Sequence, residues 1–209
     1  MSTTTSSTGT TSRAEFSAAI AAGHRVVPVL RRLFADGATP VGVYRKLAVG
    51  KPGTCLLESA EQGCIWSGWS FVGVGSRGVL TDGPDGVTWL DYGLSAERAL
   101  GASVPATGLD ALAHLYRRWS TPQVDGHPPL TGGLVGFIGW EAVRQLERLP
   151  HQPPADFDVP GQAFSFVSEL VALDHRTGSA ILIAAALNDG VDDEDALWAD
   201  AQRRLDDLQ

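Results

Sequence analysis

The stretch QAFSFVSELVALDHRTGSAILIAAA, residues 162–186, decides the fold of this protein. Two apolar runs, 162–174 and 179–186, flank the polar tetrapeptide His-Arg-Thr-Gly at 175–178. Apolar runs of strand length that are separated by a few turn-forming residues are typical of a β-hairpin. We therefore expect an antiparallel pair of strands here, and the remaining segments are placed around it.

The chain before this hairpin is also rich in predicted strands. A run at 25–29 contains Pro28, whose missing N–H places it at a sheet edge or a sheet entry. A glycine-laced strand is expected at 132–139, after the Pro/Gly-rich loop 121–129. The other short apolar runs, each bounded by Gly, Pro, Asp or Ser, lie at 55–58, 69–74, 78–81 and 87–90. This spacing is typical of an antiparallel meander.

Helical periodicity recurs between and after these strands. Thr39 and Pro40 have the pattern of a helix N-cap followed by proline in the first turn. Helices are expected at 13–22, 40–49, 108–119, 140–149 and from 192 onward. The predicted class is α+β, with mainly antiparallel, sandwich-like β-sheets and flanking helices. We expect residues 1–12 to be a disordered tail and 13–209 to be one region, with possible subregions at 13–120 and 130–209.

The last predicted helix carries an apolar stripe of Leu197, Ala201, Leu205 and Leu208. Its periodicity continues to Gln209 without the Gly, Asn or Pro that commonly ends a helix. We therefore expect the chain to be a fragment of a longer protein. We also expect the stripe to be exposed here and covered by a missing domain.

Composition narrows the functional classes. The chain has 209 residues, of which 44% are hydrophobic and six are Trp, which is enough for a sizeable core. A net charge of −8 without a basic cluster argues against nucleic acid and anionic membranes as partners. The Ser/Thr-rich start has no apolar signal segment, so a cytoplasmic location is expected. Cys55 and Cys64 lie in apolar runs and are expected to be buried, unreactive thiols.

No familiar catalytic motif accounts for the remaining polar residues. The glycines at 73, 75 and 78 fit G-x-G-x-x-G, but Gly83-Pro84 would end any following helix, so a turn or bulge is expected instead of a nucleotide site. His114 has no nucleophile near it in the sequence. The acidic run 189–195 lacks calcium-loop spacing and is expected to start a helix. The residues alone therefore predict an α+β module with no catalytic, metal or cofactor site of its own.

Several short segments together carry a resemblance to a known family. Their order and spacing over about residues 25–187 are more specific than any single piece. The chain thereby resembles the N-terminal region of component I of anthranilate synthase, a chorismate-utilising enzyme of tryptophan biosynthesis. The pieces are Val27-Pro28-Val29, Thr39-Pro40-Val41, Tyr44-Arg45-Lys46-Leu47, Leu56-Leu57-Glu58-Ser59, Trp69-Ser70-Phe71-Val72-Gly73, Gly132-Gly133-Leu134-Val135-Gly136-Phe137, Val143-Arg144, Glu147, Leu149-Pro150 and Asp174-His175.

The resemblance implies an allosteric role for this region. It implies that Leu57, Glu58 and Ser59 help bind tryptophan as a feedback effector, with Leu57 against the indole, Glu58 near the ammonium group and Ser59 donating a short hydrogen bond. Trp69 and Ser70 are expected as neighbours of that pocket. The family commonly has a basic residue just before the aromatic run, where this chain has Gly68, so no role is assigned to Gly68.

The resemblance also implies what lies elsewhere in such an enzyme. The chorismate site and the Mg²⁺-binding carboxylates belong to a larger C-terminal chorismate-binding domain, which is absent here. Ammonia comes from glutamine through an amidotransferase subunit, component II. Because the catalytic domain is missing, the chain alone is expected to be inactive. Two alternatives remain open: the corresponding region of aminodeoxychorismate synthase, and a stand-alone amino-acid-binding regulatory module without catalysis.

Overall fold

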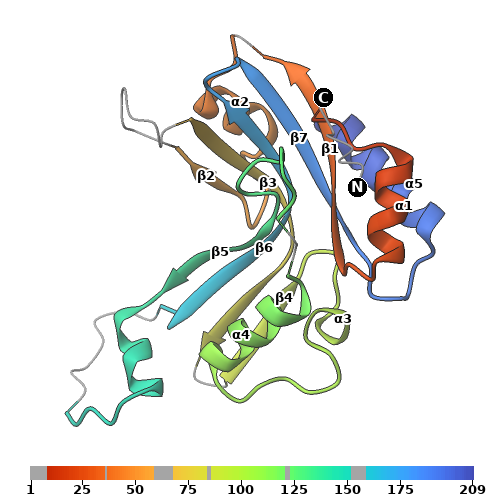
Figure 1. Ribbon diagram of the computed structural model, residues 1–209. Helices are drawn as coiled ribbons and strands as arrows, with labels where there is room; N and C mark the ends of the chain where they lie inside the picture. The colour runs from red at the N-terminus through yellow and green to blue at the C-terminus, as the bar shows by residue number, and fades with distance from the viewer. Residues whose placement is uncertain (1–8, 36, 59–67, 84–85, 121–122, 152–158) are drawn as a thin grey trace.

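The computed structural model describes residues 9–35, 37–58, 68–83, 86–120, 123–151 and 159–209, which form a sheet flanked by helices (Figure 1). This confirms the predicted α+β class. The helices are α1 (Arg13–Ala21), α2 (Pro40–Leu47), α3 (Ala96–Leu100), α4 (Gly108–Arg118), the 3₁₀ helix η1 (Trp140–Gln145) and α5 (Glu194–Asp207). The strands are β1 (Val26–Phe34), β2 (Cys55–Leu57), β3 (Trp69–Gly83), β4 (Gly86–Asp91), β5 (Gly133–Ile138), β6 (Gln162–Asp174) and β7 (Ser179–Leu187).

The described strands form one antiparallel seven-stranded sheet, whereas the sequence suggested a sandwich-like arrangement of sheets. Its main path is β1-β7-β6-β3-β2, with β4 also paired to β3 and β5 also paired to β6. The predicted hairpin is β6–β7, at the centre of this path. Strands from both expected subregions pair with each other, since β1 pairs with β7 and β3 pairs with β6.

Strand β3 is longer than the sequence suggests, because two expected strands are continuous in it. It runs for 15 residues, and its pairing with β6 shifts register at Gly73, Gly75 and Ser76. A Cβ at Gly75 would lie 2.1 Å from a carboxylate oxygen and 3.2 Å from Cβ of Glu169 on β6, so a larger residue there would require the Glu169 side chain to move. The glycine motif is therefore a β-bulge region, which confirms the predicted turn or bulge.

The edge strand β1 is covered by residues that were expected to be disordered. Its amide N–H groups at Leu30 and Arg32 donate to the hydroxyls of Thr11 and Thr10, at 3.0 and 3.2 Å. Ser12 then caps α1 in a reciprocal pair with Glu15. The prediction of a disordered tail is thus wrong for residues 9–12, because they satisfy exposed strand-edge groups, and residues 1–8 lie outside the described part.

The core lies on both faces of the sheet. Alternate residues of β7, such as Leu182 and Ala184, pack with Phe16 of α1 and Leu205 of α5 in one buried cluster. Ile183, on the opposite face of β7, belongs to a second cluster. A third cluster joins α3 and α4 to the sheet. Figure 1 shows α1 and α5 side by side along β1 and β7.

Two helical predictions are corrected by this packing. The stripe of Leu197, Ala201, Leu205 and Leu208 is buried in the first cluster, so the expectation that it is exposed is wrong. These side chains are covered by strands and helices of the same chain. The helix expected at 140–149 is only the short η1, and Leu146, which was expected on its apolar face, is exposed. No helix in the described part of the chain is both long and apolar enough to span a membrane.

Candidate functional site

Two of the residues singled out from the sequence, Leu57 and Trp69, lie where β2 meets β3. Leu57, the last residue of β2, lies opposite Phe71 of β3 in the antiparallel register. Trp69 is two residues from Phe71 and therefore lies on the same face of the sheet. The rings of Trp69 and Phe71 are stacked, with centroids 6.1 Å apart and planes inclined by 14°. We call Leu57, Trp69 and Phe71 the β2–β3 platform.

The platform is open to solvent although it borders the core. Leu57 is 41% exposed, and Trp69 and Phe71 are partly buried against the cluster that contains Ile183. An apolar surface of this kind can contact a flat ring on one side. The fold therefore provides an apolar support at this end of the sheet, close to β2 in Figure 1.

A cation lies beside the platform. The guanidinium carbon of Arg176 is 5.9 Å from the centroid of the Trp69 ring. A Cβ at Gly68 would be 3.2 Å from Nε of Arg176, so the guanidinium occupies the space next to that glycine. Sequence reasoning missed Arg176, because it reaches the platform only through the pairing of Trp69 with Asp174 across the sheet.

Arg176 is itself positioned by Asp174. The Arg176 backbone N–H and side-chain Nε donate to Oδ1 of Asp174, at 3.0 and 3.2 Å. Burial acts to raise the pKa of Asp174, but these hydrogen bonds more than offset it, and the pKa lies below its ordinary value. Asp174 therefore stays ionised at neutral pH and holds Arg176 near the platform.

The polar residues of the predicted site are not all on the platform. Glu58 is exposed and directly follows β2, next to Leu57. Ser59 lies outside the described residues. Ser70 is fully buried, and its side chain alternates to the face opposite Trp69, where its hydroxyl is 2.8 Å from Nε2 of His175. The structure thus brings Leu57 and Trp69 together, leaves Glu58 at the rim and separates Ser70 from them.

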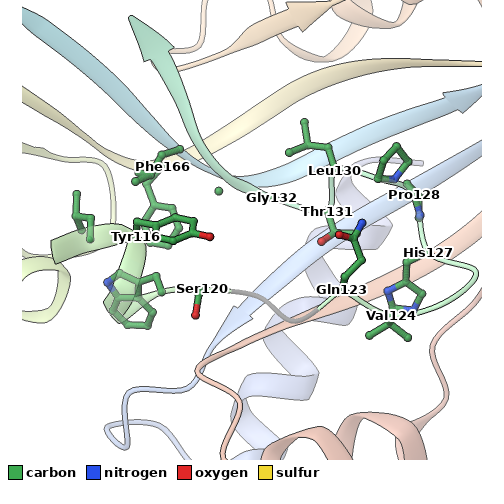
Figure 2. Close-up of a pocket in the computed structure, with 15 residues that line it drawn as sticks. Tyr116, Ser120, Gln123, Val124, His127, Pro128, Leu130, Thr131, Gly132 and Phe166 are labelled. Atoms are coloured by element: carbon green, nitrogen blue, oxygen red, sulfur yellow. The ribbon is translucent and has the colours of Figure 1, made fainter. Parts of the chain in front are cut away.

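Two cavities of about 300 Å³ lie elsewhere in the molecule. One lies between α4, the loop 123–132 and β5 (Figure 2). The other lies between the end of β7 and α5 and is lined by charged side chains that include Arg77, Arg98 and Arg204. Of the described residues that line these two cavities, none belongs to the predicted tryptophan site.

Other polar groups have structural partners. Nε2 of His114 is 2.7 Å from the carbonyl oxygen of Leu100, so the ring links α4 to α3. Cys55 is partly buried, and burial raises the pKa of its thiol, whereas Cys64 lies outside the described residues. Among the described residues, no group of three His, Cys, Asp or Glu side chains could hold a metal ion. The β2–β3 platform, in contrast, offers apolar contact, a guanidinium and a nearby carboxylate.

Known proteins resemble this chain in sequence. No family model matches it. Anthranilate synthase component 1 of Mycolicibacterium smegmatis is 45% identical over 199 residues, which are 94% of this chain and 37% of that protein. The protein of the same name from Arthrobacter globiformis is 41% identical over 90% of this chain and 35% of its own length. The resemblance to the N-terminal region of this family, inferred from the sequence, is confirmed, and the chain spans little more than a third of these relatives.

A solved structure agrees with this at the level of the fold. The crystal structure of anthranilate synthase component I from Streptococcus pneumoniae matches with a TM-score of 0.51 and 18% sequence identity. The match covers 85% of this chain and 36% of that one. In both comparisons, most of this chain matches little more than a third of a longer protein.

Proposed function

Because the chain resembles the N-terminal region of anthranilate synthase component 1, we propose that it is the regulatory and scaffolding region of such an enzyme. The enzyme would convert chorismate and ammonia from glutamine into anthranilate and pyruvate in tryptophan biosynthesis, in the cytoplasm. The observation that carries the proposal is 45% identity over 94% of this chain, to a protein of which the chain spans only 37%. The relatives described above are all of the tryptophan branch, which favours it over the folate branch.

The proposed effector is tryptophan, bound at the β2–β3 platform. Its indole would rest against Leu57, with the stacked Trp69 and Phe71 beyond. Glu58 would meet its ammonium group, and Ser59 would donate a short hydrogen bond. A pocket with an apolar floor and a few polar anchors at its rim suits an amphiphilic amino acid.

Arg176 strengthens this proposal at the position where the sequence departs from the family. The resemblance implies a basic residue before the aromatic run, where this chain has Gly68. The Arg176 guanidinium lies 3.2 Å from the point that a Cβ at Gly68 would occupy. We propose that Arg176 supplies the positive charge at this edge of the pocket and meets the effector carboxylate.

The catalytic parts of the proposed enzyme are assigned outside this chain. The described carboxylates and histidines do not fit a Mg²⁺ site, since no three of them converge. From the resemblance to the longer relatives, we assign Mg²⁺ and the chorismate site to a C-terminal chorismate-binding domain. The glutamine amidotransferase subunit, component II, is the proposed second partner. The role of the present sheet would be to carry the effector site and to support that domain.

A chimeric enzyme tests the effector site. In the Mycolicibacterium smegmatis relative, the matched region would be replaced by this chain, and anthranilate formation would be followed by fluorescence at increasing tryptophan concentration. Loss of one hydrogen bond to a buried ligand costs about 1–3 kcal/mol, so Ser59→Ala should weaken inhibition about five- to 150-fold. The KM for chorismate without tryptophan should stay unchanged, because the two sites are distinct.

Matched variants make the result decisive. Arg176→Gln should also weaken inhibition, whereas Ser103→Ala, at an exposed serine far along the chain, should leave the inhibition curve in place. Direct calorimetry of tryptophan binding to the chimera gives a second readout that does not depend on turnover. Inhibition curves that coincide for Ser59→Ala and its parent, with calorimetric affinities also equal, would refute the placement of the effector.

A further inference from the structure

The cavity shown in Figure 2 is separate from the proposed effector site and has a different chemical character. It measures about 300 Å³, at the lower end of the range for small-molecule pockets. The helix α4, the loop 123–132, the start of β5 and Phe166 of β6 surround it. Segments far apart in the sequence therefore build one concave site.

One wall is aromatic and is held in place from behind. Trp119 is 5% exposed, and its Nε1 donates to the carbonyl oxygen of Ala99 at 2.9 Å. The Trp119 ring lies 5.9 Å from that of Phe166, and the guanidinium groups of Arg25 and Arg118 lie 5.3 and 5.4 Å from it. These contacts fix the indole before any ligand arrives.

A third ring completes this wall and remains accessible. Tyr116 is 70% exposed and lies on the same side of the cavity as Phe166. Its hydroxyl points across the cavity toward Gln123 and Thr131 in Figure 2. A planar ligand could therefore contact aromatic surface on one side and polar groups on the other.

The lining offers neutral polar groups among apolar ones. Gln123 and Thr131, across the cavity from Tyr116, supply an amide and a hydroxyl, and Ser120 adds a hydroxyl on the side of Tyr116 (Figure 2). None of the described lining residues is Asp, Glu, Lys or Arg. His127 also lines the cavity, and burial lowers its pKa, so its ring is neutral at physiological pH. The guanidinium groups of Arg25 and Arg118 lie against the Trp119 ring but do not line the cavity, so a charged ligand would lose hydration here without a direct ionic contact, which is costly.

The floor of the cavity depends on a glycine. Gly132 has a φ of +145°, a conformation that other residues rarely adopt, and a Cβ there would lie 3.1 Å from the carbonyl oxygen of Val167. A larger residue would strain the backbone where β5 begins. The shape of the cavity at this point therefore depends on the backbone conformation that glycine allows at position 132.

We propose that this cavity binds a small, uncharged, planar aromatic molecule that carries a neutral hydrogen-bonding group. Rings would contact Tyr116, Trp119 and Phe166, and the polar group would bond to Gln123 or Thr131. This site is independent of the proposed tryptophan site, because tryptophan carries both an ammonium and a carboxylate group. The ligand class follows from the lining: flat apolar surface, neutral donors and acceptors, and no counter-ion.

Three probes of nearly equal size and shape test the requirement for neutrality. Benzamide is uncharged, benzoate is an anion and benzamidinium is a cation at neutral pH. Binding to the 209-residue chain would be measured by ¹H–¹⁵N NMR, with the Trp119 indole resonance assigned from Trp119→Phe. Benzamide should bind with a Kd of about 1–10 mM, as expected for so small a ligand. Benzoate and benzamidinium should each bind at least about tenfold more weakly.

Variants of exposed residues locate the site without disturbing the core. Tyr116→Ala and Gln123→Ala should each weaken benzamide binding about threefold or more, since each removes one wall contact. Arg117→Ala, at the exposed neighbour of Tyr116 outside the lining, should leave the Kd unchanged. The proposal is overturned if benzamide gives no saturable shifts up to 50 mM, if all three probes bind equally, or if neither cavity variant weakens binding while circular dichroism shows a native fold.

Discussion

The ion pair between Arg98 and Asp189 should contribute strongly to the stability of this fold. Arg98 lies on α3, and Asp189 lies between β7 and α5. Nε and Nη2 of Arg98 donate to the two carboxylate oxygens of Asp189 at 2.6 and 3.0 Å, and Nη2 also donates to Asp192 at 2.9 Å. The Asp189 side chain is 3% exposed, whereas that of Arg98 is 33% exposed. Removal of Arg98 would therefore leave a buried carboxylate without its cation.

The cost of Arg98→Ala follows from that geometry. Breaking a buried ion pair by removing one partner costs about 3–5 kcal/mol. Because one third of Arg98 is exposed, water can partly replace it, so we expect the lower end, about 3 kcal/mol of unfolding free energy. For a chain of this size each kcal/mol lowers the Tm by about 2–4 °C, so the variant should melt about 6–12 °C earlier.

The cost should depend on pH in a defined direction. In the intact protein, burial acts to raise the pKa of Asp189, but the hydrogen bonds from Arg98 more than offset it, and the pKa is lowered. The stability from this pair is therefore present above the unfolded pKa of about 3.9 and is lost as the pH falls through the folded pKa. Without Arg98, the main opposing group is the backbone N–H of Val191, which donates to Oδ1 of Asp189 at 3.3 Å, so burial should prevail and the pKa of Asp189 should rise. Protonation of Asp189 then removes the unpaired buried charge. The loss of unfolding free energy caused by Arg98→Ala should therefore be about 1 kcal/mol smaller at pH 4.5 than at pH 7.

Urea unfolding followed by circular dichroism at both pH values measures this penalty. Arg203→Ala is the matched control, because Arg203 on α5 is 66% exposed in its pairs with Asp200 and Asp207 and should contribute less than about 1 kcal/mol. Addition of Asp189→Asn to Arg98→Ala should recover part of the loss, since it removes the unpaired charge. The reasoning is refuted if Arg98→Ala costs no more than Arg203→Ala, or if its penalty is the same at both pH values.

Three further outcomes are expected. Leu205→Ala should lower the unfolding free energy by about 2–5 kcal/mol in urea titration, because Leu205 is fully buried. Gly136→Ala should lower the Tm far more than Gly83→Ala. A Cβ at Gly136 would lie 1.9 Å from the carbonyl oxygen of Ala163, whereas among the described residues no atom comes within 4 Å of a Cβ at Gly83. The 209-residue chain should form no fluorescent anthranilate from chorismate, ammonia and Mg²⁺, and turnover above a protein-free blank would contradict the proposed division of roles.

Local chemistry made most elements predictable. Thr39 accepts from the N–H of Gly42 at the start of α2, with Pro40 in the first turn, as its sequence pattern predicts. Pro28 lies in the edge strand β1, where its missing N–H is tolerated. These features depend on neighbours within a few residues, and a sequence displays such neighbours directly.

Other features depended on partners far along the chain. The apolar face of α5 was visible in the sequence, but not that β1, β7 and α1 cover it. The bulge at Gly73 and Gly75 follows from their pairing with Leu170 and Glu169 of β6, which a sequence does not display. Arg176 is adjacent to Trp69 only because Trp69 pairs with Asp174 in the sheet register. The prediction of Leu57 and Glu58 at a strand end needed only the local pattern, whereas the position of the Arg176 cation beside Trp69 needed the fold.

The two proposed sites make opposite demands on charge, so they should not share a ligand. The β2–β3 platform has the Arg176 guanidinium 5.9 Å from the Trp69 ring and the exposed Glu58 beside Leu57, which suits a zwitterion. The cavity beside α4 has only neutral described lining residues and penalises the same zwitterion by desolvation. In the chimeric enzyme, tryptophan at concentrations that fully inhibit turnover should therefore leave the Kd of benzamide unchanged in ligand-observed NMR. If tryptophan instead displaces benzamide competitively, the effector occupies the α4 cavity, and both the platform assignment and the neutral-ligand assignment fail together.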